Sequence, residues 1–239
     1  MKLVRLFILF SCFACKGFGQ TDQQFWIDLN PYIVTSETLT FYGDLGYRIE
    51  LGDNVWNRYV FRPSIRKTFT NFNITGGIGN FITTEYDGED DFTYELRPFQ
   101  GIQKNWPNNE HFKIGHYLRS EQRFVWDIDD KEFNFSLRAR YRIRLNYLHR
   151  AFLKNRLNYW KFYVAGEAFI SSQNTNYTIS EQSRLTLGLE RSFNRSRKFR
   201  MEVTWQRQDV FRPNLPFNSI YFRLRLYPSW GYQQNNNEE

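Results

Sequence analysis

The sequence predicts an all-β fold: one antiparallel, up-and-down transmembrane β-barrel of about ten strands. Three observations support this prediction. Apolar and polar residues alternate almost from end to end, which is typical of strands with one apolar and one polar face. The alternating segments run to about 13–15 residues, whereas a strand of a soluble sandwich usually has about 5–6 residues. The polar faces are rich in arginine and glutamate rather than in the threonine, serine and lysine of a solvated sheet.

The composition of the 239-residue chain excludes several other classes of protein. No apolar run reaches the roughly 18 residues that a membrane helix needs. The mean hydropathy of −0.64 would suit a soluble protein, but it also suits a membrane barrel, because alternating strands average to a polar composition. The aromatic content of 19% is far too high for a disordered chain. The length suits one all-β domain.

The N-terminal residues have the features of a signal peptide. Lys2 and Arg5 supply positive charge, and residues 6–13 form a short apolar stretch. Residues 17–19 read Gly-Phe-Gly, which places small residues where a signal peptidase requires them. We therefore predict that this segment is removed and that the protein is exported. A buried N-terminal helix is the alternative interpretation.

Cleavage before Gln20 would remove residues 1–19 together with both cysteines, Cys12 and Cys15. The mature chain would then have no thiol, no disulfide and no cysteine metal site. Lipidation of Cys12 is a second alternative, because residues 9–12 loosely resemble a lipobox. Cleavage lowers the net charge from +7 to about +4, which is too small to indicate a nucleic-acid partner.

The clearest strand is 133–147, where the odd positions are all apolar or aromatic and the even positions are asparagine, serine and arginine. Residues 39–51 repeat this pattern. Further strands are predicted at 57–69, 72–84, 91–105, 111–124, 158–171, 181–193, 198–208 and 219–228, with a less regular candidate at 23–33.

The strands between 39 and 228 number ten, and segment 23–33 is then an odd eleventh. Because bacterial barrels close with an even number of strands, we predict ten, with twelve as the alternative. In this interpretation segment 23–33 is an extension or one of a pair. The barrel domain is expected to cover residues 20–230, followed by a polar tail at 231–239.

The connections between strands are predicted to be alternately short and long. Thr70-Asn71 is a two-residue turn that leaves Phe69 and Phe72 on the same face. The other short connections are 107–110 and 194–197, and the long ones are 85–91, 126–132, 172–180 and 209–218. This alternation is typical of outer-membrane barrels, with periplasmic turns and extracellular loops.

Strand length and polarity together favour a membrane barrel over a soluble sandwich with one solvated face. A strand of about 15 residues spans about 50 Å and, tilted at about 40°, covers an apolar band of about 25 Å. The polar faces would then line the lumen, where arginine and glutamate can pair across strands. The predicted lumen-lining charges are Arg48, Glu50, Arg62, Glu95, Arg97, Arg119, Glu121, Arg123, Arg138, Arg140, Arg142, Arg144, Glu167, Arg184, Glu190, Arg223 and Arg225.

Aromatic residues gather near the ends of the predicted strands. Such residues form girdles at the two interfaces of a membrane barrel. Lys67 and Arg191 fall on the apolar face only near the short turns, where they could snorkel. The predicted girdle residues are Phe69, Phe72, Trp106, Phe112, Phe133, Tyr147, Phe193 and Phe199.

Three stretches of charged strand carry a resemblance to a known family: residues 95–100, 118–124 and 138–144. They resemble the family catalogued as domain of unknown function 2490, which consists of predicted outer-membrane barrels of Gram-negative bacteria. Phe99 stands where that family would lead us to expect tryptophan. The resemblance implies a fold and a location, and it implies no catalytic residues.

Three polar residues, Gln100, His116 and Ser120, fall on the outward face by parity. A hairpin closed at 107–110 would place Gln100 opposite His116, where a cross-strand hydrogen bond or a barrel–barrel contact would satisfy both side chains. The alternative is a lipid-facing site in which His116 activates Ser120. Four residues along one strand span about 13 Å, which is too far for a hydrogen bond. We therefore expect no catalytic residues, and the sequence shows no metal or cofactor motif.

Three functional hypotheses follow. The first is an outer-membrane barrel of a Gram-negative bacterium with a structural or binding role, in contact with outer-membrane lipid. Its lumen has a surplus of arginine and would accept a small anionic ligand. The second is a narrow anion-selective channel, since about ten strands leave little room beyond the side chains. The third is an outer-membrane lipid hydrolase.

Overall fold

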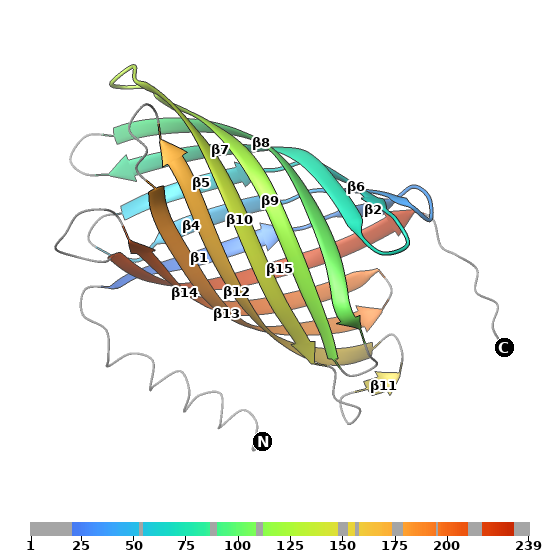
Figure 1. The fold of residues 1–239 in the computed structure, drawn as a ribbon. Coiled ribbons are helices and arrows are strands. Elements are labelled where there is room, and N and C mark those ends of the chain that lie inside the picture. The colour runs from blue at the N-terminus through green and yellow to red at the C-terminus, as the bar shows by residue number, and fades with distance from the viewer. Residues whose placement is uncertain are drawn as a thin grey trace.

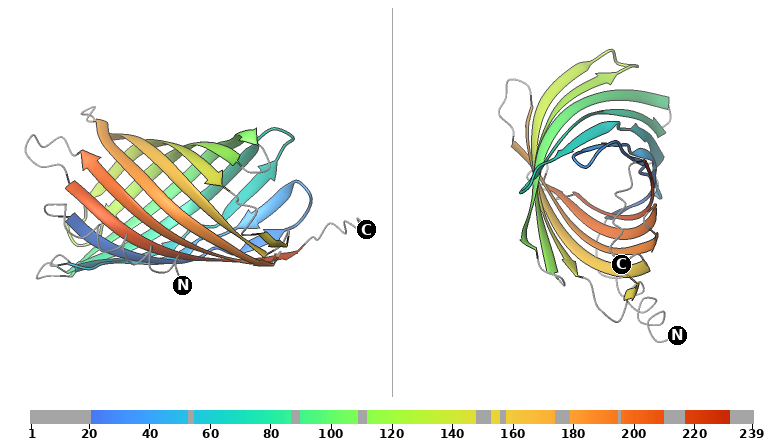
Figure 2. Two further views of the ribbon diagram at one scale, coloured as in Figure 1. Left: turned by 90° about the horizontal axis from the view of Figure 1, so that it is seen from below. Right: turned by 90° about the vertical axis from the view of Figure 1, so that its right-hand side faces the viewer.

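The computed structural model describes residues 21–52, 55–86, 90–108, 112–147, 153–155, 158–173, 179–194, 196–209 and 217–231. These residues form one β-sheet that closes into a barrel (Figures 1 and 2). In this part of the chain no helix is long and apolar enough to cross a membrane. The predicted signal peptide and the tail beyond Gly231 lie outside the described residues.

The sheet consists of fifteen strand segments among the described residues. Their bounds are β1 Thr21–Leu29, β2 Tyr32–Val34, β3 Leu39–Tyr42, β4 Leu45–Glu50, β5 Val55–Phe61, β6 Ser64–Thr68, β7 Asn73–Tyr86, β8 Asp90–Asn108, β9 Phe112–Asp127, β10 Phe133–Tyr147, β11 Leu153–Asn155, β12 Asn158–Gln173, β13 Ile179–Asn194, β14 Arg197–Asp209 and β15 Phe217–Gly231.

Six of the shorter strands are halves of three interrupted barrel strands: β1 with β2, β3 with β4, and β5 with β6. Two of the three interruptions contain a proline, Pro31 or Pro63, which has no N–H to donate to a neighbouring strand. The proline carbonyls still accept hydrogen bonds from the next barrel strand, at 3.0 Å from the N–H of Gly43 and 3.1 Å from that of Ile78. The wall therefore bends locally without opening.

The predicted all-β closed barrel is confirmed, but it has eleven strands rather than ten or twelve. The eleventh is the segment predicted at 23–33, which forms β1 and β2. Neighbours alternate in direction around an up-and-down barrel, so an odd number requires one parallel pair. That pair is β1 with β15, from Thr21↔Asn218 to Leu29↔Leu226. The prediction of an even number failed because it assumed that every pair is antiparallel.

The connections define two ends of the barrel. At the turn end the chain passes from β2 to β3, β6 to β7, β8 to β9, β10 to β12 and β13 to β14, and at the loop end it passes from β4 to β5, β7 to β8, β9 to β10, β12 to β13 and β14 to β15. The turn at 69–72 agrees with its prediction, since the N–H of Phe69 donates to the carbonyl of Phe72 at 2.9 Å. The strict alternation of lengths is wrong, because 148–157 at the turn end is long and contains β11, which pairs with the start of β12.

Large apolar side chains are exposed on the outer face of the long strands β7, β8, β9, β10, β12, β13, β14 and β15, and on β1 to β6 as well. Examples from opposite parts of the wall are Ile27, Ile78, Leu118 and Leu185, each 45–54% exposed. On the inner face the buried side chains are mainly charged, hydroxyl-bearing or aromatic. The molecule is therefore apolar outside and polar inside, the reverse of a soluble globular domain.

Candidate functional site: the charged interior of the barrel

The strand alternation turns all the predicted lumen charges toward the barrel interior. A cavity of about 750 Å³ lies there, and every one of these residues lines it except Glu95 and Glu190. Those two side chains are buried in ion pairs on the same face. The cavity runs from Asp22 and Glu50 near the loop end to Tyr42 and Arg66 near the turn end.

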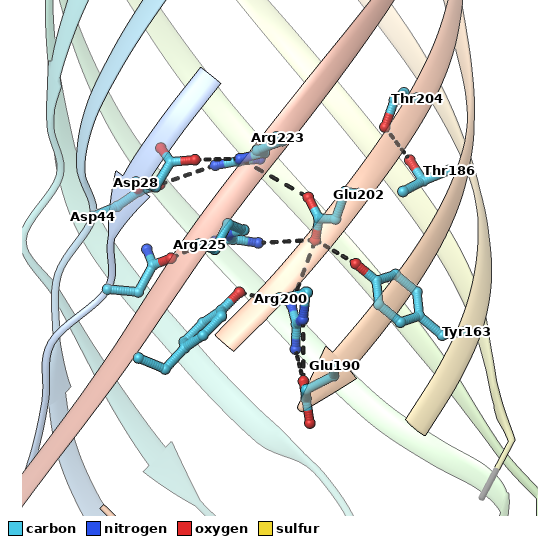
Figure 3. Close-up of polar contacts among 12 residues, drawn as sticks. Asp28, Asp44, Tyr163, Thr186, Glu190, Arg200, Glu202, Thr204, Arg223 and Arg225 are labelled. Atoms are coloured by element: carbon cyan, nitrogen blue, oxygen red, sulfur yellow. Dashed lines mark hydrogen bonds and ion pairs between the residues drawn. The ribbon is translucent and has the colours of Figure 1, made fainter. Parts of the chain in front are cut away.

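The first ion-pair network joins the two sides of the parallel seam between β1 and β15 (Figure 3). Arg223 on β15 donates to Asp28 on β1. Its Nη2 lies 3.8 Å from a carboxylate oxygen of Asp44, and its Nε lies 3.9 Å from a carboxylate oxygen of Glu202. Arg62 pairs with Asp44 from the other side. One arginine thus links carboxylates from three barrel strands.

Glu202 on β14 connects this network to a second group of charges (Figure 3). It accepts a hydrogen bond from the Tyr163 hydroxyl. Its Oε1 lies 3.5 Å from Arg225 Nη1 and 3.7 Å from Arg200 Nη1. Arg200 also donates to Glu190, whose other oxygen lies 2.6 Å from Lys161 Nζ.

Two further networks occupy the opposite wall. Glu95 accepts two hydrogen bonds from Arg97, at 2.9 and 2.5 Å, and two from Arg123, at 2.5 and 3.2 Å. Arg97 also lies close to Glu121, with 3.7 Å between its Nη1 and the carboxylate oxygen. Arg119 and Arg138 contact the same carboxylate.

The last network is centred on Glu167, which faces Arg140 at 2.6 Å, Arg142 at 3.6 Å and Arg184 at 3.9 Å. The carboxylates at the centres of these networks, Asp44, Glu95, Glu121, Glu167, Glu190 and Glu202, are therefore each shared by two or more cations. Burying an ion is costly unless an opposite charge and hydrogen bonds compensate it, and sharing supplies that compensation with few carboxylates.

Cations still outnumber anions in the interior. Among the residues that the structure describes, fifteen arginines and seven aspartates and glutamates line the cavity. Asp28, Glu95 and Glu190 raise the number of acids on this face to ten. The interior therefore keeps a positive surplus, which attracts anions and repels cations.

Four of the arginines that line the cavity have no carboxylate within ion-pair distance among the described residues, and each lies over an aromatic ring instead. The guanidinium carbon of Arg48 is 4.0 Å from the ring centroid of Trp26, and that of Arg66 is 4.7 Å from Tyr42. Arg58 lies over Trp56 at 5.3 Å, and Arg144 lies over Tyr163 at 5.4 Å. The ring faces stabilise these cations without neutralising their charge.

The sequence prediction missed part of this interior. Asp28 and Trp26 belong to the segment that was not counted in the barrel, although Gln24, Trp26 and Asp28 alternate there with apolar residues. It also missed inward-facing rings such as Trp26, which stacks on Tyr221 with centroids 3.9 Å apart. These aromatics occupy polar-face positions, so the alternation in β1 was the available signal.

A glycine makes room for one of these rings. Tyr163 lies flat against the wall over Gly188, its partner on the neighbouring strand. A Cβ atom at position 188 would collide with the ring carbons of Tyr163. The glycine therefore places the Tyr163 hydroxyl against Glu202.

The outward polar residues do not pair as predicted. Gln100 lies opposite Ser120, and His116 lies opposite Lys104, a shift of four residues. The prediction failed because it closed the hairpin at 107–110, whereas β8 continues to Asn108 and β9 begins only at Phe112, which shifts the register between the two strands.

The imidazole of His116 is held between two neighbouring strands. Its Nδ1 lies 2.8 Å from the Tyr141 hydroxyl, and its Nε2 lies 3.1 Å from the carbonyl of Trp106. The cross-strand hydrogen bond expected of His116 thus exists with a different partner, Tyr141 rather than Gln100. With both nitrogens engaged in this way, His116 is not directed at Ser120 as a hydrolase would require.

The predicted girdle residues lie at the barrel ends on the outer face. Phe133 is at the loop end, where its ring is 5.4 Å from that of Trp126. Outward cations lie beside aromatic rings at the turn end. The Nζ of Lys67 is 5.5 Å from the ring centroid of Phe69, and the guanidinium carbon of Arg191 is 5.0 Å from that of Trp160. The other girdle residues, all at the turn end, are Phe69, Phe72, Trp106, Phe112, Tyr147, Phe193 and Phe199.

Comparison with known proteins places the chain in a family. Neither curated proteins nor solved structures include a significant match to this sequence. Residues 23–218 match the family model described as a protein of unknown function, DUF2490. This match covers most of the chain and extends from β1 to the start of β15, in agreement with the resemblance seen in the charged strands. The chain belongs to the DUF2490 family.

Proposed function

We propose that this protein is an integral outer-membrane β-barrel of a Gram-negative bacterium whose arginine-rich lumen binds small anions. The observation that carries the location is the outer face, where large apolar side chains are exposed on barrel strands all around the wall. Soluble proteins rarely expose continuous apolar surface on this scale, whereas a barrel in hydrocarbon requires it. The aromatic rings at both ends fit the two membrane interfaces.

In the proposed orientation the loop end faces the cell exterior and the turn end faces the periplasm, as in other outer-membrane barrels. Since β1 runs parallel to β15, Thr21 then lies at the exterior end and Gly231 at the periplasmic end. The first strand would thus cross the membrane in the same direction as the last.

The binding role rests on the positive surplus within a cavity of about 750 Å³, which is large enough for a small molecule. If the lumen binds no anion, the remaining role is a structural one, in which the ion pairs stabilise the wall.

Fractionation tests the proposed location. We expect the protein in the outer-membrane fraction, with faster gel migration before boiling than after, because a closed barrel resists detergent until it is heated. A protein that is released with the soluble fraction and migrates identically in both states would contradict the proposal.

A narrow anion-selective channel is the second candidate, because the cavity lining extends from residues near the loop end to residues near the turn end. Purified protein in a planar bilayer should then give discrete conductance steps, and the reversal potential in a salt gradient should show anion preference. A protein that inserts without any steps would eliminate this candidate and leave the binding role.

A further inference from the structure

One wall of the interior holds six arginines around Glu121 and Glu167: Arg97, which also pairs with Glu95, and five others. We name these five the arginine cluster: Arg119, Arg138, Arg140, Arg142 and Arg184. The first two contact Glu121, and the other three contact Glu167. With two negative charges for five positive ones, this part of the wall has an uncompensated charge of +3.

The centre of the cluster is a pair of like charges. Arg119 on β9 and Arg140 on β10 are direct partners across the two strands, and both face inward. Like charges opposite each other destabilise a sheet. An anion between the two guanidinium groups would convert this repulsion into attraction.

The hydrogen-bond donors of the cluster also lack acceptors. Five guanidinium groups carry about 25 N–H donors, whereas two carboxylates offer about eight acceptor positions. Two of the nitrogens, Arg119 Nη2 and Arg140 Nε, are buried and have no hydrogen-bond partner among the described residues. Arg119 itself is only 5% exposed.

Aromatic rings hold the cluster in place. The guanidinium carbon of Arg119 lies 3.6 Å from the ring centroid of Phe99. The buried ring of Phe169 has three guanidinium groups around it, those of Arg138 and Arg140 at 5.3 Å and that of Arg184 at 4.7 Å. Side chains that are ordered in advance lose less conformational entropy when a ligand binds.

We propose that the arginine cluster is a binding site for a small oxyanion, a phosphate or carboxylate group, bound between Arg119 and Arg140. Both groups match the forked geometry of guanidinium donors, which a spherical halide does not. The cavity in front of the cluster leaves room for such a ligand. This inference deepens the proposed anion-binding lumen and does not depend on the location in the outer membrane.

Titration calorimetry on the full chain, folded in detergent, tests the site. Inorganic phosphate and succinate are titrated separately, with chloride at equal ionic strength as the reference. We expect saturable binding of at least one oxyanion, with Arg119→Gln and Arg140→Gln weakening it about tenfold or more. Arg191→Gln, which removes an outward cation, should leave the affinity unchanged.

Arg119→Lys keeps the charge and separates recognition from folding. It should preserve the heat-modifiable barrel but still weaken oxyanion binding, because an ammonium group lacks the fork. A wild-type protein that shows no oxyanion binding above the chloride reference would overturn the inference. Equal affinity in wild type, Arg119→Lys and Arg140→Gln would overturn it as well.

The two proposals fail in different ways. A folded barrel that binds phosphate or succinate but does not fractionate with the outer membrane would contradict only the proposed location. An outer-membrane barrel that binds neither would contradict the oxyanion site and leave the proposed location intact.

Discussion

Single buried carboxylates hold several arginines in the interior of this barrel. Glu121 is the clearest case, since its side chain is 1% exposed and contacts Arg97, Arg119 and Arg138. Each such glutamate offsets the desolvation of more than one cation. The stability of the wall therefore depends on a few acidic residues more than on any one arginine.

We predict that Glu121→Gln destabilises the folded barrel by about 3–5 kcal/mol, because it leaves three buried guanidinium groups without their shared anion. Glu132→Gln, the same change at an exposed position in the loop-end connection, should change stability by less than about 0.5 kcal/mol. Urea unfolding of the refolded proteins, followed by tryptophan fluorescence, measures both. Equal unfolding midpoints for the two variants would contradict the shared role of Glu121.

A second prediction concerns the glycine beneath Tyr163. Gly188→Ala should lower the free energy of unfolding by about 1–3 kcal/mol, because the added methyl group displaces the ring and with it the hydrogen bond to Glu202. Gly166→Ala lies close by on the outer face, where a Cβ would meet only Ile143 at 3.7 Å. It should be neutral within about 0.5 kcal/mol. If both variants unfold at the same urea concentration, the close approach of Tyr163 to Gly188 does not contribute to the free energy of unfolding.

At the scale of elements, the parallel seam between β1 and β15 is the unusual feature. Parallel pairing is slightly less stable per residue than antiparallel pairing. The seam is reinforced by inward side chains: Arg223 donates to Asp28, Arg225 Nε donates to Asn30 Oδ1 at 2.9 Å, and Trp26 stacks on Tyr221. Polar and aromatic pairs thus stabilise the closure of an odd-numbered barrel.

The direction of the seam can be tested with paired cysteines. Ile27→Cys combined with Leu224→Cys should form a disulfide on mild oxidation, because these residues are direct partners and partners in a sheet satisfy disulfide geometry. Ile27→Cys combined with Ile220→Cys is the matched control. Those positions are four residues apart along the seam, about 13 Å, but would be partners if β1 ran antiparallel about the same centre.

Non-reducing gels distinguish the two outcomes, with both native cysteines replaced in each variant. Cross-linking of the control pair and not of the first pair would show that β1 and β15 are antiparallel.

At the scale of the whole molecule, the two faces of the wall differ in polarity. The outer face offers hydrocarbon-compatible side chains on every side, and the inner face concentrates charge around the cavity. A closed sheet has no free edge, so all backbone donors in the central wall can be paired. This combination suits a protein that spans a bilayer and presents a charged interior.

We predict that a charge on the outer face is tolerated according to its depth. Leu118→Arg, near the middle of β9, should cost about 2–4 kcal/mol in lipid vesicles, whereas Phe193→Arg at the turn end should cost about 0–1 kcal/mol. The two native side chains are equally exposed, at 54% and 53%. Urea titrations of folding into vesicles measure this difference. Equal costs at the two depths would contradict a membrane-spanning outer face.

The period-two alternation was sufficient to predict the class of fold, the positions of the long strands, and the inward orientation of residues such as Arg140 and Glu167. The reason is local: successive side chains of a strand point to opposite faces, so parity alone assigns each residue to a face once the strand is recognised. The same parity assigned His116 to the outer face, and it put Phe69 and Phe72 on one face across the turn at 69–72.

Pairing between strands was decided only by the tertiary structure. Alternation is the same for parallel and antiparallel neighbours, so it could not reveal that β1 joins β15 and makes the number of strands odd. It could not fix the register that places His116 opposite Lys104, nor select Tyr163 and Arg200 as partners of Glu202. Those contacts depend on register and on the curvature of a closed wall, which bring together residues that are distant in the sequence.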